Sequence, residues 1–74
     1  MQKKFIYDSI VAVMPTAKIE IETEDNVHFF MSVWAKEFKG KSMLEQHRMI
    51  YDAVGEKVGA EIHALSLKTY ILED

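Results

Sequence analysis

Apolar residues recur with a helical period in two stretches of the chain. Within residues 3–13 they are spaced three and four apart, at Phe5, Ile6, Ser9, Ile10 and Val13, which predicts a helix. Pro15 should end it, because the residue before a proline is disfavoured in the α conformation.

The second helical pattern is predicted to run from Met43 to Val58. Its apolar stripe is formed by Leu44, His47, Tyr51, Val54 and Val58, with Met43 and Ile50 beside it. Ser42 and Glu45 form a capping box just before this run. Gly55 would cost the helix interior about 1 kcal/mol relative to alanine. Gly59 is placed to terminate the helix.

Three other stretches alternate with the period of a β-strand. Residues 17–23 place Ile19 and Ile21 on one face and charged residues on the other, as in a half-buried strand. Residues 24–27 form a loop that suits an antiparallel hairpin to a second strand, 28–35. A connector over 36–42, with room for one helical turn, precedes the second helix. Residues 62–71 are the last strand.

The element order α-β-β-α-β predicts an α+β fold with a three-stranded mixed sheet. The first two strands are antiparallel. The third lies parallel to the second, because a strand–helix–strand crossover within one sheet is parallel and right-handed. Both helices should cover one face of the sheet. No linker, repeat or low-complexity tract interrupts residues 1–74, which predicts a single domain.

Composition and charge limit the classes of protein to which the chain can belong. The chain has a net charge of −3, no cysteine, and 49% hydrophobic and 28% charged residues. It is too apolar to be disordered, and it has no disulfide framework. The apolar runs are short, so we expect no membrane span and no signal peptide. Together with the absence of cysteine, this makes a cytoplasmic, reducing location the expectation. No nucleophile–base set, phosphate-binding loop or dinucleotide fingerprint occurs, so we do not expect an enzyme.

Histidines are the most informative side chains. His47 lies in the apolar stripe of the second helix, where a packed structural role is expected. His28 and His63 each stand near the start of a strand, and parallel neighbours would bring them to one end of the sheet. Two imidazoles there could share a metal ion. Strand alternation, however, places His63 on the face of Leu65 and Leu67, whereas His28 is opposite to Phe29. If Phe29 and the two leucines all face the core, the two rings leave the sheet on opposite sides unless a strand start is irregular.

A basic group surrounds Gly40 before the second helix and includes Lys36, Lys39, Lys41 and Arg48. The free N–H groups at a helix start attract anions, so a phosphate contact is one interpretation. The other is a salt-bridged helix face, because Glu45 and Asp52 lie three residues before and four after Arg48.

Residues 28–69 resemble the BolA family. The resemblance is carried by four ordered blocks, His28-Phe29, Phe38-Lys39-Gly40-Lys41-Ser42, His47-Arg48-Met49-Ile50-Tyr51 and the run from Val58 to Thr69 that includes His63-Ala64. It implies a class II KH-like fold, α-β-β-α-(α)-β, in which the connector near Phe38 is the additional helix.

The resemblance also implies a function. Members of this family pair with monothiol glutaredoxins of the CGFS type and share a [2Fe-2S] cluster, for iron–sulfur trafficking or iron sensing. The cluster histidine of the family corresponds to His63. A second ligand usually comes from the first hairpin loop, which here holds neither His nor Cys, so His28 is the nearest candidate. The chain is then expected as a monomer alone or as a heterodimer with the glutaredoxin.

A rival expectation is a nucleic-acid-binding transcription regulator. KH domains clamp DNA or RNA backbone with a GxxG loop. The corresponding residues here are Gly40-Lys41-Ser42-Met43, which lack the second glycine. Lys36, Lys39, Gly40, Lys41 and Arg48 would then make the contacts.

Overall fold

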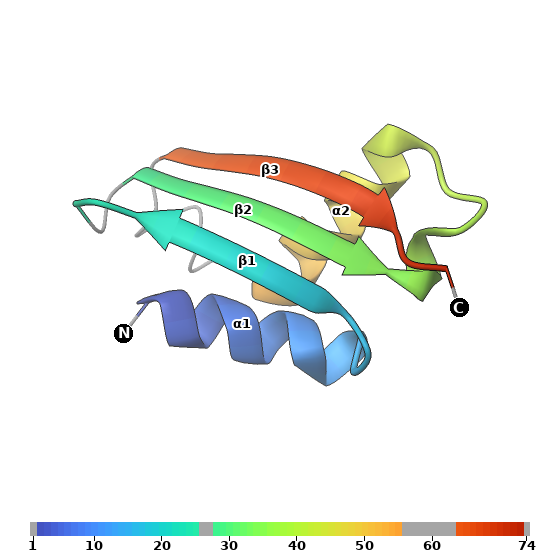
Figure 1. The fold of residues 1–74 in the computed structure, drawn as a ribbon, viewed down its shortest axis with the longest axis horizontal. Helices are drawn as coiled ribbons and strands as arrows, with labels where there is room; N and C mark the ends of the chain where they lie inside the picture. The colour runs from blue at the N-terminus through green and yellow to red at the C-terminus, as the bar shows by residue number, and fades with distance from the viewer. Residues whose placement is uncertain (1, 26–27, 56–63, 74) are drawn as a thin grey trace.

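The computed structural model describes residues 2–25, 28–55 and 64–73 of the 74-residue chain. Figure 1 shows the three strands side by side, with one helix below them in this view and the other passing behind them. The elements, in chain order, are α1 (Gln2–Val13), β1 (Lys18–Thr23), β2 (His28–Ala35), the short 3-10 helix η1 (Lys36–Phe38), α2 (Met43–Val54) and β3 (Ala64–Ile71). The predicted α+β order is confirmed, and η1 is the helical turn expected in the connector.

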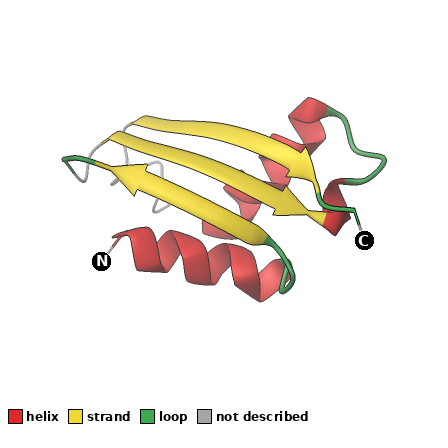
Figure 2. Ribbon diagram, in the orientation of Figure 1, coloured by secondary structure: helices red, strands yellow, loops and turns green. Residues whose placement is uncertain are grey.

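The sheet has the order β1-β2-β3, and β2 is its central strand. It pairs antiparallel with β1, where Ile21 lies opposite Met31, and parallel with β3, where His28 lies opposite Ala64. The antiparallel hairpin and the parallel third strand are therefore both confirmed. Figure 2 shows the three strands as one twisted layer.

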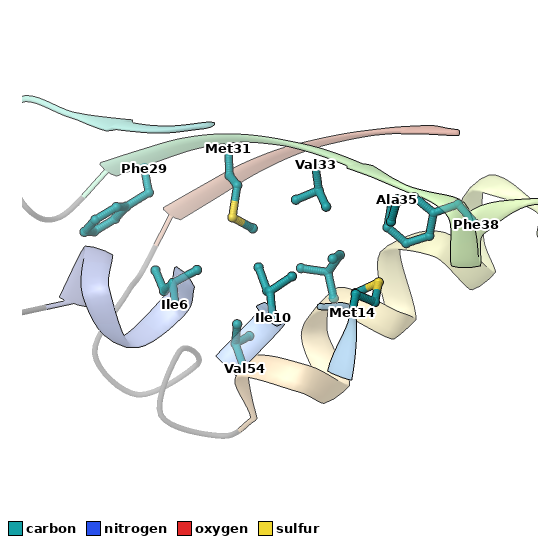
Figure 3. Close-up of a cluster of buried hydrophobic side chains, with 10 residues drawn as sticks. Ile6, Ile10, Met14, Phe29, Met31, Val33, Ala35, Phe38 and Val54 are labelled. Atoms are coloured by element: carbon teal, nitrogen blue, oxygen red, sulfur yellow. The ribbon is translucent and has the colours of Figure 1, made fainter. Parts of the chain in front are cut away.

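The core lies between this layer and the two helices. Figure 3 shows side chains from β2 pointing down towards α1 and α2. The buried apolar set comprises Ile6, Ile10, Met14, Phe29, Met31, Val33, Ala35, Phe38, Ile50 and Val54. Every second residue of β2 belongs to it, as expected of a strand with one face packed on helices.

The predicted helical faces are rotated from the observed ones. In α1 Ile6 and Ile10 are buried, and Met14, the residue that follows the helix, continues this buried line, while Val13 is exposed. In α2 the predicted stripe is wrong at Leu44 and Tyr51, which are exposed, whereas Gln46 is buried. Gln46 stays inside because both ends of its side-chain amide are hydrogen-bonded, as described below.

The second helix ends four residues earlier than predicted, at Val54. Gly55 is not a helix-interior residue. It adopts a positive φ of 72°, which glycine accepts readily, and its N–H donates to the Tyr51 carbonyl. The predicted cap at Gly59 and the strand start at residues 62–63 lie outside the described residues.

The start of α2 is the capping box that the sequence predicts. The Glu45 N–H donates to Ser42 Oγ at 3.2 Å, and the Ser42 N–H donates to Glu45 Oε1 at 2.9 Å. The bond that the carboxylate accepts from the Ser42 backbone N–H, followed by the Ser42 side chain, lowers the pKa of the Glu45 carboxyl below its usual value. Because Glu45 turns back to Ser42, it does not form the predicted ion pair with Arg48. Arg48 belongs to none of the ion pairs seen in the described part of the chain.

Replacing the capping serine tests this helix start. Ser42→Ala should lower the free energy of unfolding by about 1 kcal/mol, because an orphan N–H of the first turn loses its acceptor. Urea denaturation followed by circular dichroism measures it. Ser66→Ala, at an exposed strand position, is the control and should stay within about 0.5 kcal/mol of the wild type. Equal stability of Ser42→Ala and wild type would contradict the cap.

The lowered pKa of Glu45 predicts a pH dependence. A carboxyl group with a depressed pKa in the folded state stabilises the fold above its unfolded pKa. That contribution is lost as pH falls through the folded pKa. Glu45→Gln should therefore be less stable than the wild type at neutral pH, and the difference should shrink towards pH 3. Denaturation curves at several pH values measure the difference, with Glu24→Gln in the hairpin loop as the control. A difference that does not change with pH would refute the linkage.

Candidate functional site

His28 is held at the start of β2 by the hairpin loop before it. Its backbone N–H donates to Asp25 Oδ1 at 2.9 Å, and its ring Nδ1 lies 2.8 Å from Asp25 Oδ2. The Thr23 hydroxyl donates to the His28 carbonyl at 2.7 Å. The loop therefore fixes both the backbone and the ring of His28.

Asp25 also determines which ring nitrogen is available. An ionised carboxylate can only accept, so Nδ1 carries the proton in this bond and Nε2 of a neutral ring keeps its lone pair. A carboxylate behind a histidine is the usual arrangement for a metal ligand, because it fixes the tautomer and makes the ring more basic. The His28 side chain is 62% exposed, so a partner molecule can reach it.

Sequence reasoning overlooked Asp25. The available signal was the three-residue spacing between Asp25 and His28 across a turn, which allows one carboxylate to bond both the backbone and the ring. Such a pair has no apolar periodicity, so it is visible only once the hairpin is known.

The register of β3 brings the second candidate segment to the same place. His28 is the parallel partner of Ala64, the first residue of β3. In the sequence Ala64 directly follows His63, which lies outside the described residues. The prediction that the His28 and His63 segments meet at one end of the sheet is thus supported as far as Ala64. His28 is exposed on the face opposite to the helices, as alternation predicted.

His47 is half-buried on α2, which agrees with a packed residue. Its Nε2 atom is buried and has no hydrogen-bond partner within the described part of the chain. Among residues 2–25, 28–55 and 64–73, no three histidine or carboxylate side chains lie together in a way that could hold a metal ion.

The basic group lies at the other end of β2. Lys36, Lys39 and Lys41 are exposed around Gly40, whose φ is 81°. About 23 Å separates this end from His28, given eight residues at about 3.3 Å per step. Arg48 is exposed on the second turn of α2. Because the two candidate sites are far apart, substitutions can test them separately.

Two features reduce the attraction of this end for phosphates. Lys36 and Lys39 line a hollow of about 300 Å³ that is also lined by the acidic residue Glu73. The start of α2, where free N–H groups were expected to attract an anion, already carries the Glu45 carboxylate on the Ser42 N–H.

A buried polar chain anchors the Gly40 loop to the sheet. The Thr69 hydroxyl of β3 donates to Gln46 Oε1 at 2.6 Å, and Gln46 Nε2 donates to the Lys41 carbonyl at 2.9 Å. Both side chains are only 7% exposed. This bonding explains why a glutamine occupies the buried face of α2, and it holds the loop that carries Lys39, Gly40 and Lys41.

No helix of the described ranges has the length and apolar composition needed to cross a membrane.

Solved structures resemble this fold closely. The BolA domain of SufE1 from Arabidopsis thaliana superposes with a TM-score of 0.82 at 23% identity, covering 95% of this chain and 91% of that one. A BolA protein homologue from Coxiella burnetii gives a TM-score of 0.73 at 36% identity, covering 89% and 85%. The first likeness concerns the fold alone, whereas the second extends to the sequence.

Curated relatives share shorter segments. The DNA-binding transcriptional regulator BolA of Escherichia coli is 36% identical over 47 residues, which are 64% of this chain and 45% of that protein. The protein BOLA2 of Arabidopsis thaliana is 48% identical over 40 residues, 54% of this chain and 42% of that protein. The matched part is thus less than half of either relative. The family model described as BolA-like protein matches residues 4–74. On this match, and on the shared fold, the chain belongs to the BolA family.

Proposed function

We propose that this protein is a non-catalytic partner of a monothiol glutaredoxin and that the two chains together hold a [2Fe-2S] cluster. The observation that carries the proposal is the His28–Asp25 pair at the end of the sheet where β3 begins. His63, which corresponds to the cluster histidine of the BolA family, directly precedes that strand.

The donor set of the chain fits half of such a site. Iron–sulfur clusters take thiolates for at least half of their ligands, and this sequence contains no cysteine. The chain can therefore contribute only imidazole ligands, and the thiolates must come from the partner. Imidazole in place of thiolate raises the reduction potential of a bound cluster. Asp25 would hold the His28 ring in the form that leaves Nε2 available.

Mixing experiments with single variants test the proposal. The protein is combined with a monothiol glutaredoxin, glutathione, iron and sulfide, and the visible absorption of the complex is recorded. His63→Ala should remove or shift the absorption bands that the wild-type mixture shows. His47→Gln, which changes the histidine outside the proposed site, is the control and should leave the bands unchanged. Far-ultraviolet circular dichroism verifies that each variant is folded.

The outcomes separate the parts of the proposal. A wild-type mixture whose spectrum equals that of the glutaredoxin alone would refute the shared cluster. A His63→Ala complex with the wild-type spectrum and cluster lifetime would refute the ligand assignment of His63. His28→Ala decides the second ligand: a change as large as that of His63→Ala assigns it to His28. Asp25→Asn should then shorten the cluster lifetime, because the ring loses the carboxylate that orients it.

A second candidate function is nucleic-acid binding through the Gly40 loop. It is favoured by the similarity to the Escherichia coli regulator and by the three exposed lysines around Gly40. If these lysines bind phosphates, the logarithm of affinity should fall linearly with the logarithm of salt concentration. Replacing Lys39 and Lys41 by glutamine should flatten this slope by roughly one unit for each phosphate that is no longer neutralised.

Fluorescence anisotropy with labelled duplex and single-stranded DNA measures these slopes. Lys3→Gln, on the first turn of α1, is the matched control for the removal of a positive charge. Undetectable binding at low salt, or an equal slope for the variant with both lysines replaced and the control, would refute this function.

A further inference from the structure

One face of the sheet is covered by neither of the two long helices that the described residues form. Both helices pack against the face of Phe29, Met31 and Val33 (Figure 3). The other face, called the open face below, is formed by alternate residues of the three strands. Its described side chains are Lys18, Glu20 and Glu22 of β1, His28, Phe30, Ser32 and Trp34 of β2, and Ser66, Lys68 and Tyr70 of β3.

The open face has an aromatic centre. Phe30 is 59% exposed. The half-buried Trp34 stacks on Tyr70 with ring centroids 5.0 Å apart and an interplanar angle of 16°. The Lys18 ammonium lies 5.0 Å from the Trp34 ring centroid. Exposed aromatic side chains gathered on one face are a common mark of an interaction surface.

The small residues of the open face leave a hollow beside Phe30. It has a volume of about 200 Å³, and its lining includes Ser32 and Ser66 together with Glu20, Glu22 and Lys68. An aromatic ring standing next to a hollow of this kind is a shape that a second, identical face can complement.

The strand register arranges the open face in three rows. Counted from β1 to β3, the rows are Lys18–Trp34–Tyr70, Glu20–Ser32–Lys68 and Glu22–Phe30–Ser66. The two middle-strand aromatics stand on the centre line. In the second row Glu20 on the edge strand β1 and Lys68 on the edge strand β3 carry opposite charges. The face is therefore complementary to the same face of a second copy when β1 of one copy lies over β3 of the other.

We propose that two copies of this chain associate through their open faces, about a two-fold axis that runs parallel to the strands between the two sheets. This axis places β1 of one copy over β3 of the other. Glu20 then faces the second copy's Lys68, twice per dimer, and Lys18 faces Tyr70. The Phe30 rings of the two copies meet at the axis, where the adjacent hollows give them room.

The other face-to-face arrangement is disfavoured by charge. A two-fold axis in the same plane but across the strands would place β1 over β1. Glu20 would then lie opposite the second copy's Glu20, and like charges across an interface cost several kcal/mol. Sheets packed face to face lie about 10 Å apart and are rotated by about 30°. The middle row, closest to the centre of the face, keeps its pairing under that rotation.

The size of the face indicates a weak dimer. Three strands about 4.8 Å apart and eight residues of about 3.3 Å give a plane of about 380 Å². Stable complexes bury about 800 Å² on each partner. The chain should thus be a monomer at low concentration and dimerise as concentration rises.

Charge exchange tests the arrangement. The association constant of the full chain is measured by sedimentation equilibrium from about 10 μM to about 1 mM, which brackets a weak dimer. E20K and K68E should each reduce it by about tenfold or more, because like charges then face each other twice. The double variant E20K/K68E restores both pairs with the signs exchanged and should recover most of the association. E24K, in the hairpin loop, makes the same charge change outside the face and should leave the constant within about twofold of the wild type.

Trp34, the single tryptophan of the chain, is a built-in probe. Its emission should shift to shorter wavelength over the same concentration range, and Phe30→Ser should abolish both the shift and the dimer. Circular dichroism confirms that the variants are folded. A monomer mass throughout the range would overturn the proposal. The same result is expected if the open face binds a different protein instead of a second copy. A dimer that E20K and K68E weaken no more than E24K would also overturn it.

Discussion

The strict alternation of β2 is the constraint on which the rest of the structure depends. As the central strand it is paired on both sides, so its odd-numbered residues must all be covered by helices and its even-numbered residues must all face away from them. A shift of the register by one residue would expose Phe29, Met31 and Val33 together. The same alternation fixes His28 at one end and the Gly40 loop beyond the other.

The two ends of β2 are secured by different devices. At the His28 end, exposed side chains of the hairpin bond the ring and the backbone. At the Gly40 end, the buried pair Gln46 and Thr69 holds a loop carbonyl. Exposed bonds contribute little to stability but orient a side chain, whereas a satisfied buried pair is costly to break. The His28 end is thus suited to a metal-binding side chain that presents one ring nitrogen. The Gly40 end is suited to a loop that keeps a fixed position.

Much of the fold could be predicted because local patterns of the amino-acid sequence specify it. Alternation identified all three strands, the crossover rule gave the parallel pairing, and the Ser42–Glu45 spacing gave the cap. The errors have specific physical causes. Apolar periodicity continues past Gly55 and so predicts a longer helix, but the positive φ of this glycine ends it. Periodicity also places Leu44 in the buried stripe and leaves Gln46 out of it. The partner of Gln46 is Thr69, 23 residues away in the sequence, so no local sequence pattern predicts this bond.

The candidate site was predictable in part for the same reason. Histidine positions at strand starts and the absence of cysteine could be read directly. The Asp25–His28 bond and the Trp34–Tyr70 stack depend on a turn geometry and a strand register, so they became visible only in three dimensions.

The bonding of Gln46 has a consequence for motion. Since Gln46 Nε2 holds the Lys41 carbonyl while Thr69 holds Gln46 Oε1, the loop before α2 cannot swing outwards without leaving buried polar atoms unpaired. Opening of this loop therefore requires a disturbance of β3 and cannot occur as a purely local fluctuation. In hydrogen exchange, the Lys41 amide, which donates to the Phe38 carbonyl, should behave as part of the same cooperative unit as the core, although it lies in an exposed connection between helices.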